Sequence, residues 1–187
     1  MNLPGPQYLG LAYFLSELLL SVTRRSRGDG VRQDRSTLRV LWLVIMVSVA
    51  VGVYVSMHLP AGALSHRNFW RALGVGLFVG GIALRWWAIV TLGRFFTVDV
   101  QIAKNHELVE RGPFRLIRHP SYTGVLLAFV GFALSLVNWI AFLVIVLPIF
   151  VAFILRMSVE EQALTNALGS SYADYMRRTR RLVPGVY

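Results

Sequence analysis

The chain contains no cysteine among its 187 residues, only one lysine and few charged residues. Without cysteine it forms no disulfide, no thiolate metal site and no cysteine nucleophile. Charged residues make up 15% of the chain, whereas 56% of the residues are hydrophobic and the mean hydropathy is +0.58. Soluble domains carry about 25% charged residues. The composition therefore predicts an all-α polytopic integral membrane protein.

Missing motifs narrow the functional classes further. The four histidines lack metal-ligand spacing and no acidic cluster joins them, so the sequence predicts no metal site. No P-loop is present and no G-x-G-x-x-G follows a strand, so any nucleotide-like cofactor must be bound without a Rossmann fold. The net charge of +10 could indicate nucleic acid. However, the positive residues fall in alternate loops rather than on one face, which predicts no nucleic-acid partner.

Five apolar segments are present, at residues 8–22, 38–57, 73–92, 122–137 and 139–155. A full span needs about 20 apolar residues, which the second and third segments provide. We expect the shorter fourth and fifth segments to form a tight helical hairpin that turns at Asn138 and Trp139. Four glycines of the third segment would permit close helix contact, or reflect only the tolerance of membrane helices for glycine: Gly74, Gly76, Gly80 and Gly81.

The connections between these segments differ in positive charge. Arginine and lysine are frequent in the first and third connections and in the tail, and scarce or absent in the second and fourth. The positive-inside rule then places the N-terminus outside and the tail in the cytoplasm, and five spans make this alternation consistent. The ratio of 18 arginines to one lysine is typical of GC-rich bacterial genomes, which indicates a bacterial inner membrane.

A polar cluster, Arg118-His119-Pro120-Ser121-Tyr122, precedes the hairpin. Proline suits the first turn of a helix, so we expect the fourth helix to begin at Pro120. A helix start offers free N–H groups and a partial positive charge, which together favour an anion. An alternative interpretation is an interfacial belt of arginine, histidine and tyrosine.

A second polar cluster, Arg156 with Glu160 and Glu161, follows the hairpin. Arg156 and Glu160 are four residues apart and share one helix face, whereas Glu161 points about 100° away from Glu160. The cluster could hold a polar ligand or form a simple surface ion pair. Glu17 and Arg85 also lie within apolar segments, and we expect Arg85 to reach the cytoplasmic end rather than to pair with a carboxylate of the site.

These clusters belong to longer motifs that resemble a known family. Residues 108–124, LVERGPFRLIRHPSYTG, resemble the cofactor segment of the isoprenylcysteine carboxyl methyltransferases. Glu160-Glu161-x-x-Leu164, followed by Gly169-x-x-Tyr172-x-x-Tyr175 and a basic stretch ending in Pro184, resembles the family's C-terminal signature. The N-terminal half resembles short prokaryotic-type members in its number of spans.

The resemblance implies S-adenosylmethionine as cofactor, in a cytoplasmic pocket formed by the loop before the fourth helix, the hairpin and the tail. It implies one methyltransferase domain over 1–187, with a three-helix part at 1–92 and a cofactor-binding catalytic part at 93–187. Arg156 matches the position that holds the substrate carboxylate, and Arg156 and Glu160 are the predicted catalytic residues. Phe114 replaces the family's more usual tyrosine, so a hydroxyl contact is lost there. The implied cofactor-binding residues are Gln101, His106, Glu107, Leu108, Val109, Phe114, His119, Pro120, Ser121, Tyr122 and Glu160.

The implied activity is methyl transfer to the carboxylate of an isoprenylcysteine-like lipophilic acceptor. The alternatives are methyl transfer to a phospholipid amine or a small thiol, an NADPH-dependent reductase of the sterol type, and a non-catalytic scaffold. Membrane lipids and a lipidated or small lipophilic acceptor are the expected partners. In a bacterium the natural acceptor need not be a prenylated protein.

Overall fold

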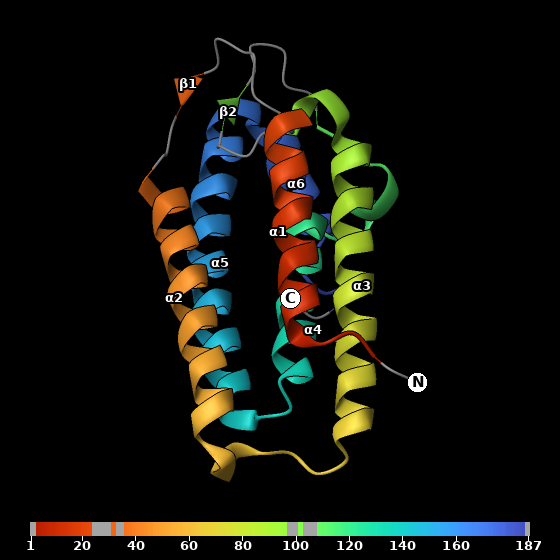
Figure 1. The fold of residues 1–187 in the computed structure, drawn as a ribbon. Helices are drawn as coiled ribbons and strands as arrows, with labels where there is room; N and C mark the ends of the chain where they lie inside the picture. Colours follow the sequence, from red (N-terminus) through yellow and green to blue (C-terminus); the bar gives the residue numbers. More distant parts are fainter. Residues whose placement is uncertain (1–2, 24–30, 33–35, 97–100, 103–107, 186–187) are drawn as a thin grey trace.

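The protein is a bundle of long helices in a computed structural model that describes residues 3–23, 31–32, 36–96, 101–102 and 108–185 (Figure 1). At residues 31, 32, 36, 94, 101 and 102 only the backbone is described. Two short strands, β1 (Val31–Arg32) and β2 (Gln101–Ile102), pair antiparallel. The helices are α1 (Pro6–Thr23), α2 (Ser36–His58), α3 (Arg67–Leu92), α4 (Pro120–Ser135), α5 (Trp139–Leu168) and α6 (Ser170–Arg178), with 3-10 turns at η1 (Pro60–Gly62), η2 (Gly93–Phe95) and η3 (Gly112–Arg115).

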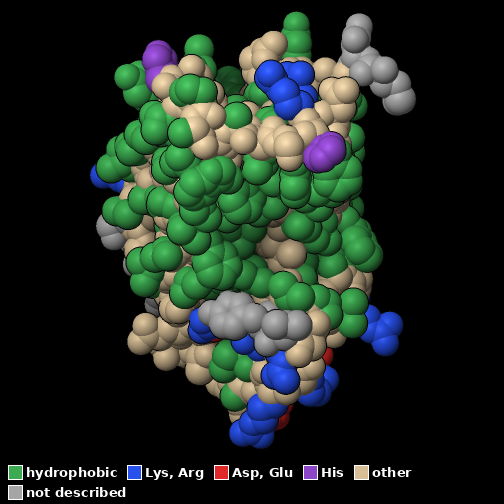
Figure 2. Space-filling view, turned by 90° about the horizontal axis from the view of Figure 1, so that it is seen from below, with side chains coloured by type: hydrophobic (Ala, Val, Ile, Leu, Met, Phe, Trp, Pro, Cys, Tyr) green, Lys and Arg blue, Asp and Glu red, His purple; other side chains and the backbone are tan. Residues whose placement is uncertain are grey.

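Each of the five predicted apolar segments forms a helix. Among the described residues, three helices are long and apolar enough to cross a membrane: α3, α5 and residues Thr37–His58 of α2. The α4 helix has 16 residues and counts as a shorter apolar helix. Hydrophobic side chains cover most of the surface in Figure 2, while arginine side chains lie near its edges. The chain is thus an integral membrane protein, and the number of five spans stays a prediction.

The fifth helix continues from the apolar segment into the tail. Its apolar part ends at residue 155, and α5 continues beyond it without interruption to a total of 30 residues. Helix-forming residues continue the helix beyond the apolar stretch until Gly169, which has a φ of 58° and ends it. Glycine adopts this left-handed conformation without the steric cost that other residues incur. The α6 helix begins directly after Gly169.

Helix pairs rather than layers build the bundle. The α3 helix packs along α4 and α2 packs along α5, while α1 contacts α3 and α4 (Figure 1). Two of the predicted glycines explain the close approach of α3 to α4. A Cβ atom on Gly81 would lie 2.5 Å from the Gly124 carbonyl oxygen, and one on Gly74 would lie 2.6 Å from the Gly131 carbonyl oxygen. Gly76 and Gly80 face open space, so only the tolerance of membrane helices for glycine explains these two.

The hairpin between α4 and α5 turns where it was predicted to turn. Asn138 precedes α5, and its side-chain oxygen accepts a hydrogen bond from the Ala141 N–H at 3.0 Å. Asparagine is a favourable N-cap because it satisfies an N–H group that the helix itself leaves unpaired. The Asn138 amide also donates to the Leu59 carbonyl at 2.9 Å, which joins the hairpin to the end of α2.

The unequal lengths of the helices leave room for a site. At 1.5 Å per residue, α4 is about 24 Å long, whereas α3 and α5 reach about 39 and 45 Å. Because α4 begins only at Pro120, the upper parts of α3 and α5 in Figure 1 extend beyond its start. The cavity described below lies at this start.

Candidate active site

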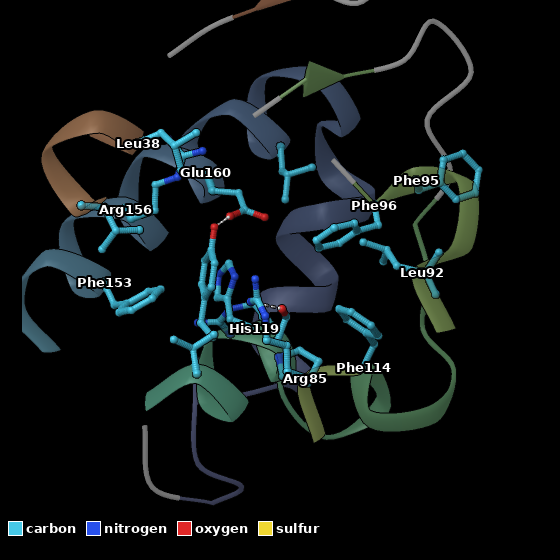
Figure 3. Close-up of a pocket in the computed structure, with 18 of the residues that line it drawn as sticks. Leu38, Arg85, Leu92, Phe95, Phe96, Phe114, His119, Phe153, Arg156 and Glu160 are labelled. Atoms are coloured by element: carbon cyan, nitrogen blue, oxygen red, sulfur yellow. Dashed lines mark hydrogen bonds between the residues drawn. The ribbon is translucent and has the colours of Figure 1, made fainter. Parts of the chain in front are cut away.

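A large cavity lies at the start of α4, bounded by α1, α2, α3, α5 and α6. With its open mouth it has a volume of about 1350 Å³. Figure 3 shows its two sides: Arg156, Leu38 and Phe153 on one, Phe95, Phe96 and Leu92 on the other, with Glu160 and His119 between them.

The first polar cluster supplies one wall of the cavity. Pro120 is the first residue of α4, as predicted, and no side chain caps the N–H groups at this end. His119, Pro120, Ser121 and Tyr122 all line the cavity. The His119 and Tyr122 rings stack with their centroids 5.5 Å apart, so each ring restricts the other.

Two residues of the second polar cluster, Arg156 and Glu160, also line the cavity. The Tyr122 hydroxyl donates to Glu160 Oε2 at 2.6 Å, and this bond joins the two clusters across the hairpin (Figure 3). Arg156 is 1% exposed, and its Nη1 atom donates to the Thr37 hydroxyl at 2.6 Å. Sequence reasoning missed Thr37, because a threonine near the start of a membrane helix carries no distinguishing signal. The structure therefore brings the two predicted catalytic residues into one cavity.

The expectation for Arg85 and Glu17 is wrong. Arg85 does not reach for solvent: its Nε and Nη2 atoms lie 2.8 and 2.9 Å from the two carboxylate oxygens of Glu17, and both side chains are nearly buried. Its Nη1 atom also donates to the Ser121 hydroxyl at 3.1 Å. A charge in an apolar environment is costly unless it is paired, so pairing prevails over exposure. The presence of opposite charges in two apolar segments was the signal for this pair.

Glu161 lies outside the cavity, where it joins the tail to the start of α4. Its carboxylate accepts from Arg118 Nε at 2.8 Å and from Arg181 Nη2 at 2.6 Å, and it lies 3.2 Å from His119 Nε2. Backbone bonds reinforce this junction, since the Arg118 N–H donates to the Arg180 carbonyl at 2.7 Å. Glu160 and Glu161 thus have different surroundings, as their predicted divergence on the helix requires.

Aromatic side chains form the remaining wall, and two tyrosines of α6 belong to it. Phe114 lines the cavity, and its carbonyl accepts a hydrogen bond from the Tyr175 hydroxyl at 2.7 Å. Burial, and then the charge of Glu110, raises the pKa of Tyr175. Tyr172 is 2% exposed, and within the described part of the chain its buried hydroxyl has no hydrogen-bond partner.

Most predicted site residues lie in this one cavity. Those that the structure describes there are Leu108, Val109, Phe114, His119, Pro120, Ser121, Tyr122, Arg156 and Glu160. His106, Glu107 and the side chain of Gln101 lie outside the described residues. Within the described ranges, no three side chains of the types His, Cys, Asp and Glu are grouped to hold a metal ion.

The chemistry of the cavity suits a ligand with both an aromatic and a cationic part. Phenylalanine and tyrosine rings offer flat apolar surface to an aromatic group. The Glu160 carboxylate attracts positive charge, and the start of α4 favours a carboxylate of the ligand. The buried Tyr172 hydroxyl adds a polar group that has no hydrogen-bond partner among the described residues.

Known proteins resemble this chain in sequence and in fold. Residues 74–166 match the profile of the Isoprenylcysteine carboxyl methyltransferase (ICMT) family. Protein-S-isoprenylcysteine O-methyltransferase B of Arabidopsis thaliana is 34% identical over 123 residues, which are 64% of this chain and 62% of the relative. Protein-S-isoprenylcysteine O-methyltransferase A of the same plant is 28% identical over 181 residues, which are 95% of this chain and 91% of the relative.

The fold is also similar to a solved structure, that of the eukaryotic intramembrane Ras methyltransferase ICMT. The two chains superpose with a TM-score of 0.69 at 26% sequence identity. The match covers 92% of this chain and 61% of the solved chain. The chain thus spans somewhat less than two thirds of the length of that structure and of the first plant relative.

Proposed function

Because the chain belongs to the isoprenylcysteine carboxyl methyltransferase family, we propose that it methylates the carboxylate of an isoprenylcysteine-like lipophilic acceptor in the membrane, with S-adenosylmethionine as methyl donor. The observation that carries the proposal is one cavity that is lined by Arg156, by Glu160 and by the first residues of α4. When bound, S-adenosylmethionine supplies a methyl group on a positively charged sulfur, so that a carbon–oxygen bond forms, a carbon–sulfur bond breaks and a neutral thioether remains.

Residues of both polar clusters would hold the methyl donor. The N–H groups at the start of α4 would bind its carboxylate, because helix starts attract anions. Glu160, oriented by its hydrogen bond from Tyr122, would bind the ribose hydroxyls or the ammonium group. His119, Leu108, Val109 and Phe114 would complete this half of the cavity. Gln101, His106 and Glu107 remain proposed contacts on the strength of the family motif.

Arg156 would hold the acceptor. A carboxylate with a reference pKa of about 4 is already ionised at neutral pH, so the reaction needs no general base. It needs an aligned and partly dehydrated nucleophile. A guanidinium can grip a carboxylate with two parallel hydrogen bonds, and Thr37 holds that of Arg156 in place at 1% exposure.

The hydrocarbon part of the acceptor would lie along the apolar side of the cavity. That side is formed by Leu38, Leu41, Trp42 and Ile45 of α2 together with Phe153 of α5. These helices are in the membrane bundle, so a lipophilic acceptor can come from the bilayer while the donor comes from water. We place the cavity and the C-terminus on the cytoplasmic side of a bacterial inner membrane, with the N-terminus outside.

Substitution of Arg156 tests the assignment. We expect Arg156→Ala to reduce methylation of a prenylcysteine analogue by at least about 100-fold, because the loss of a buried charged contact costs several kcal/mol. Binding of S-adenosylhomocysteine, measured by calorimetric titration, should survive. Arg67→Ala, a matched change at an exposed residue at the start of α3, should retain activity. Loss of S-adenosylhomocysteine binding in Arg156→Ala would contradict the acceptor role.

The same preparation distinguishes the alternatives. Methylation of phosphatidylethanolamine, but not of the prenylcysteine analogue, would favour the phospholipid amine. Binding of NADPH in place of S-adenosylmethionine would favour a reductase. Binding of neither cofactor would favour a scaffold without catalytic activity.

A further inference from the structure

Two tyrosines of α6, one helical turn apart, use their hydroxyl groups differently. Tyr175 donates to the Phe114 carbonyl at 2.7 Å and so fixes η3 against α6. Tyr172 also lines the cavity and is 2% exposed, but its hydroxyl makes no hydrogen bond with any described residue. Buried hydroxyl groups in proteins are nearly always paired, because an unpaired one loses the hydrogen bonds that it made in water.

The groups around Tyr172 indicate that its hydroxyl would act as the donor in a hydrogen bond to a ligand. Burial, and then the charges of Glu161 and Glu160, raise the pKa of Tyr172, so its hydroxyl remains protonated at neutral pH. It can therefore act as a donor. The same two carboxylates disfavour an anion beside it. The partner that suits this position is a neutral acceptor atom on the ligand.

The residues that line the cavity with Tyr172 further limit which ligand group its hydroxyl can contact. Tyr172 lines the same cavity as Phe114, Leu164 and Leu168, and most of the residues that line this cavity are aromatic or aliphatic. Its ring lies 5.9 Å from that of Tyr175, which is anchored by its own hydrogen bond. The Tyr172 ring is thus restricted by packing before a ligand arrives, which reduces the entropy lost on binding.

We propose that Tyr172 is a further residue of the donor site, and that its hydroxyl donates a hydrogen bond to a ring nitrogen or ribose oxygen of the adenosyl group. The inference rests on the proposed function, because it takes S-adenosylmethionine to be the ligand. It assigns α6, which none of the predicted contacts includes, a direct part in selecting the methyl donor.

The change Tyr172→Phe removes the hydroxyl alone. We expect the affinity for S-adenosylhomocysteine, measured by calorimetric titration on the purified full chain, to fall about 3- to 10-fold, as for the loss of one neutral hydrogen bond. The affinity for 5′-methylthioadenosine, which lacks the amino-acid part, should fall by the same factor. The melting temperature without ligand should stay the same or rise, since the change removes an unpaired buried hydroxyl.

Two matched controls accompany this variant. Tyr54→Phe changes an exposed tyrosine that does not line the cavity, and it should leave both affinities unchanged. Tyr175→Phe removes a hydroxyl that is hydrogen-bonded within the protein, and it should lower the melting temperature without ligand.

Three other results would contradict either this inference or the proposed function. Equal affinities of wild type and Tyr172→Phe would show that the hydroxyl is served by water, and the inference would fail while the proposed function stands. A loss with S-adenosylhomocysteine alone would move the contact to the amino-acid part and overturn the adenosyl assignment. If the wild type binds neither compound, the proposed function itself fails.

Discussion

Glu160 and Glu161 are neighbours in the chain, but their side chains belong to different parts of the molecule. Glu160 accepts a hydrogen bond from Tyr122 inside the cavity. Glu161 binds Arg118 and Arg181 and so attaches the tail to the start of α4. The 100° rotation per residue of a helix separates the two carboxylates, and the sequence alone predicts this separation. It does not predict which cations Glu161 binds.

We therefore expect substitution of Glu161 to affect the stability of the protein more than methyl transfer. We expect Glu161→Gln to lower the free energy of unfolding by about 3 kcal/mol, because it leaves the nearly buried Arg118 without its charged partner. Asp174→Asn is the matched control: Asp174 is 60% exposed in its pair with Arg177, and exposed pairs contribute less than about 1 kcal/mol. Denaturant or thermal unfolding in detergent measures both. Equal changes in the free energy of unfolding for the two variants would show that the Glu161 junction stabilises the protein no more than an exposed ion pair.

Among the helices, α3 and α4 form a close seam that glycine makes possible. Gly81 and Gly124 face each other there, and a Cβ on either would lie 2.5–2.6 Å from backbone atoms of the other helix. A backbone cannot move aside as a side chain can, so this seam tolerates no additional methyl group. The two helices bring Arg85 and Ser121 together at the cavity, so the seam also positions part of the site.

Alanine at these glycines tests the seam. We expect Gly81→Ala to destabilise the protein by about 1–3 kcal/mol through overpacking, and to lower activity because α4 is displaced. Gly80→Ala, one residue away and facing open space, should be neutral or stabilising by up to about 1 kcal/mol, because alanine favours a helix over glycine. Melting temperatures of the two variants provide the comparison. A Gly80→Ala variant as unstable as Gly81→Ala would contradict this account.

At the scale of the whole molecule, one helix is short and the tail completes the site beside it. The α5 helix continues beyond its apolar part and α6 follows it, so both elements after the hairpin contribute residues to the same cavity. The cavity therefore lies at one end of the bundle. The described arginines just before α4 and in α6 belong to that end, and the positive-inside rule then predicts a cytoplasmic site.

The absence of cysteine makes this orientation directly measurable. Ser65, between η1 and α3, and Ser170, at the start of α6, are both exposed. We expect a membrane-impermeant maleimide to label Ser65→Cys in intact bacterial cells, and to label Ser170→Cys only after lysis. The parent chain, with no cysteine, serves as the unlabelled control. Labelling in the opposite order would reverse the topology.

The sequence by itself determined the positions of the five apolar helices, the start of α4 at Pro120, the turn at Asn138 and the break at Gly169. Each of these follows from local causes: hydropathy over about 20 residues, the fixed φ of proline, the capping side chain of asparagine and the left-handed φ of glycine. Its motifs also identified nine described residues that line one cavity. Local chemistry and motif resemblance suffice for predictions of this kind.

Only the tertiary structure decided which side chains meet. Arg85 pairs with Glu17, which is 68 residues away in the sequence, and Arg156 binds Thr37, which is 119 residues away. Local pattern contains no information about such partners, because they depend on which helices pack and in what register. The same is true of Tyr172, since a tyrosine in a helical tail looks alike in sequence whether its hydroxyl is paired or unpaired. An unpaired hydroxyl costs free energy only when it is buried, and burial is a property of the assembled bundle.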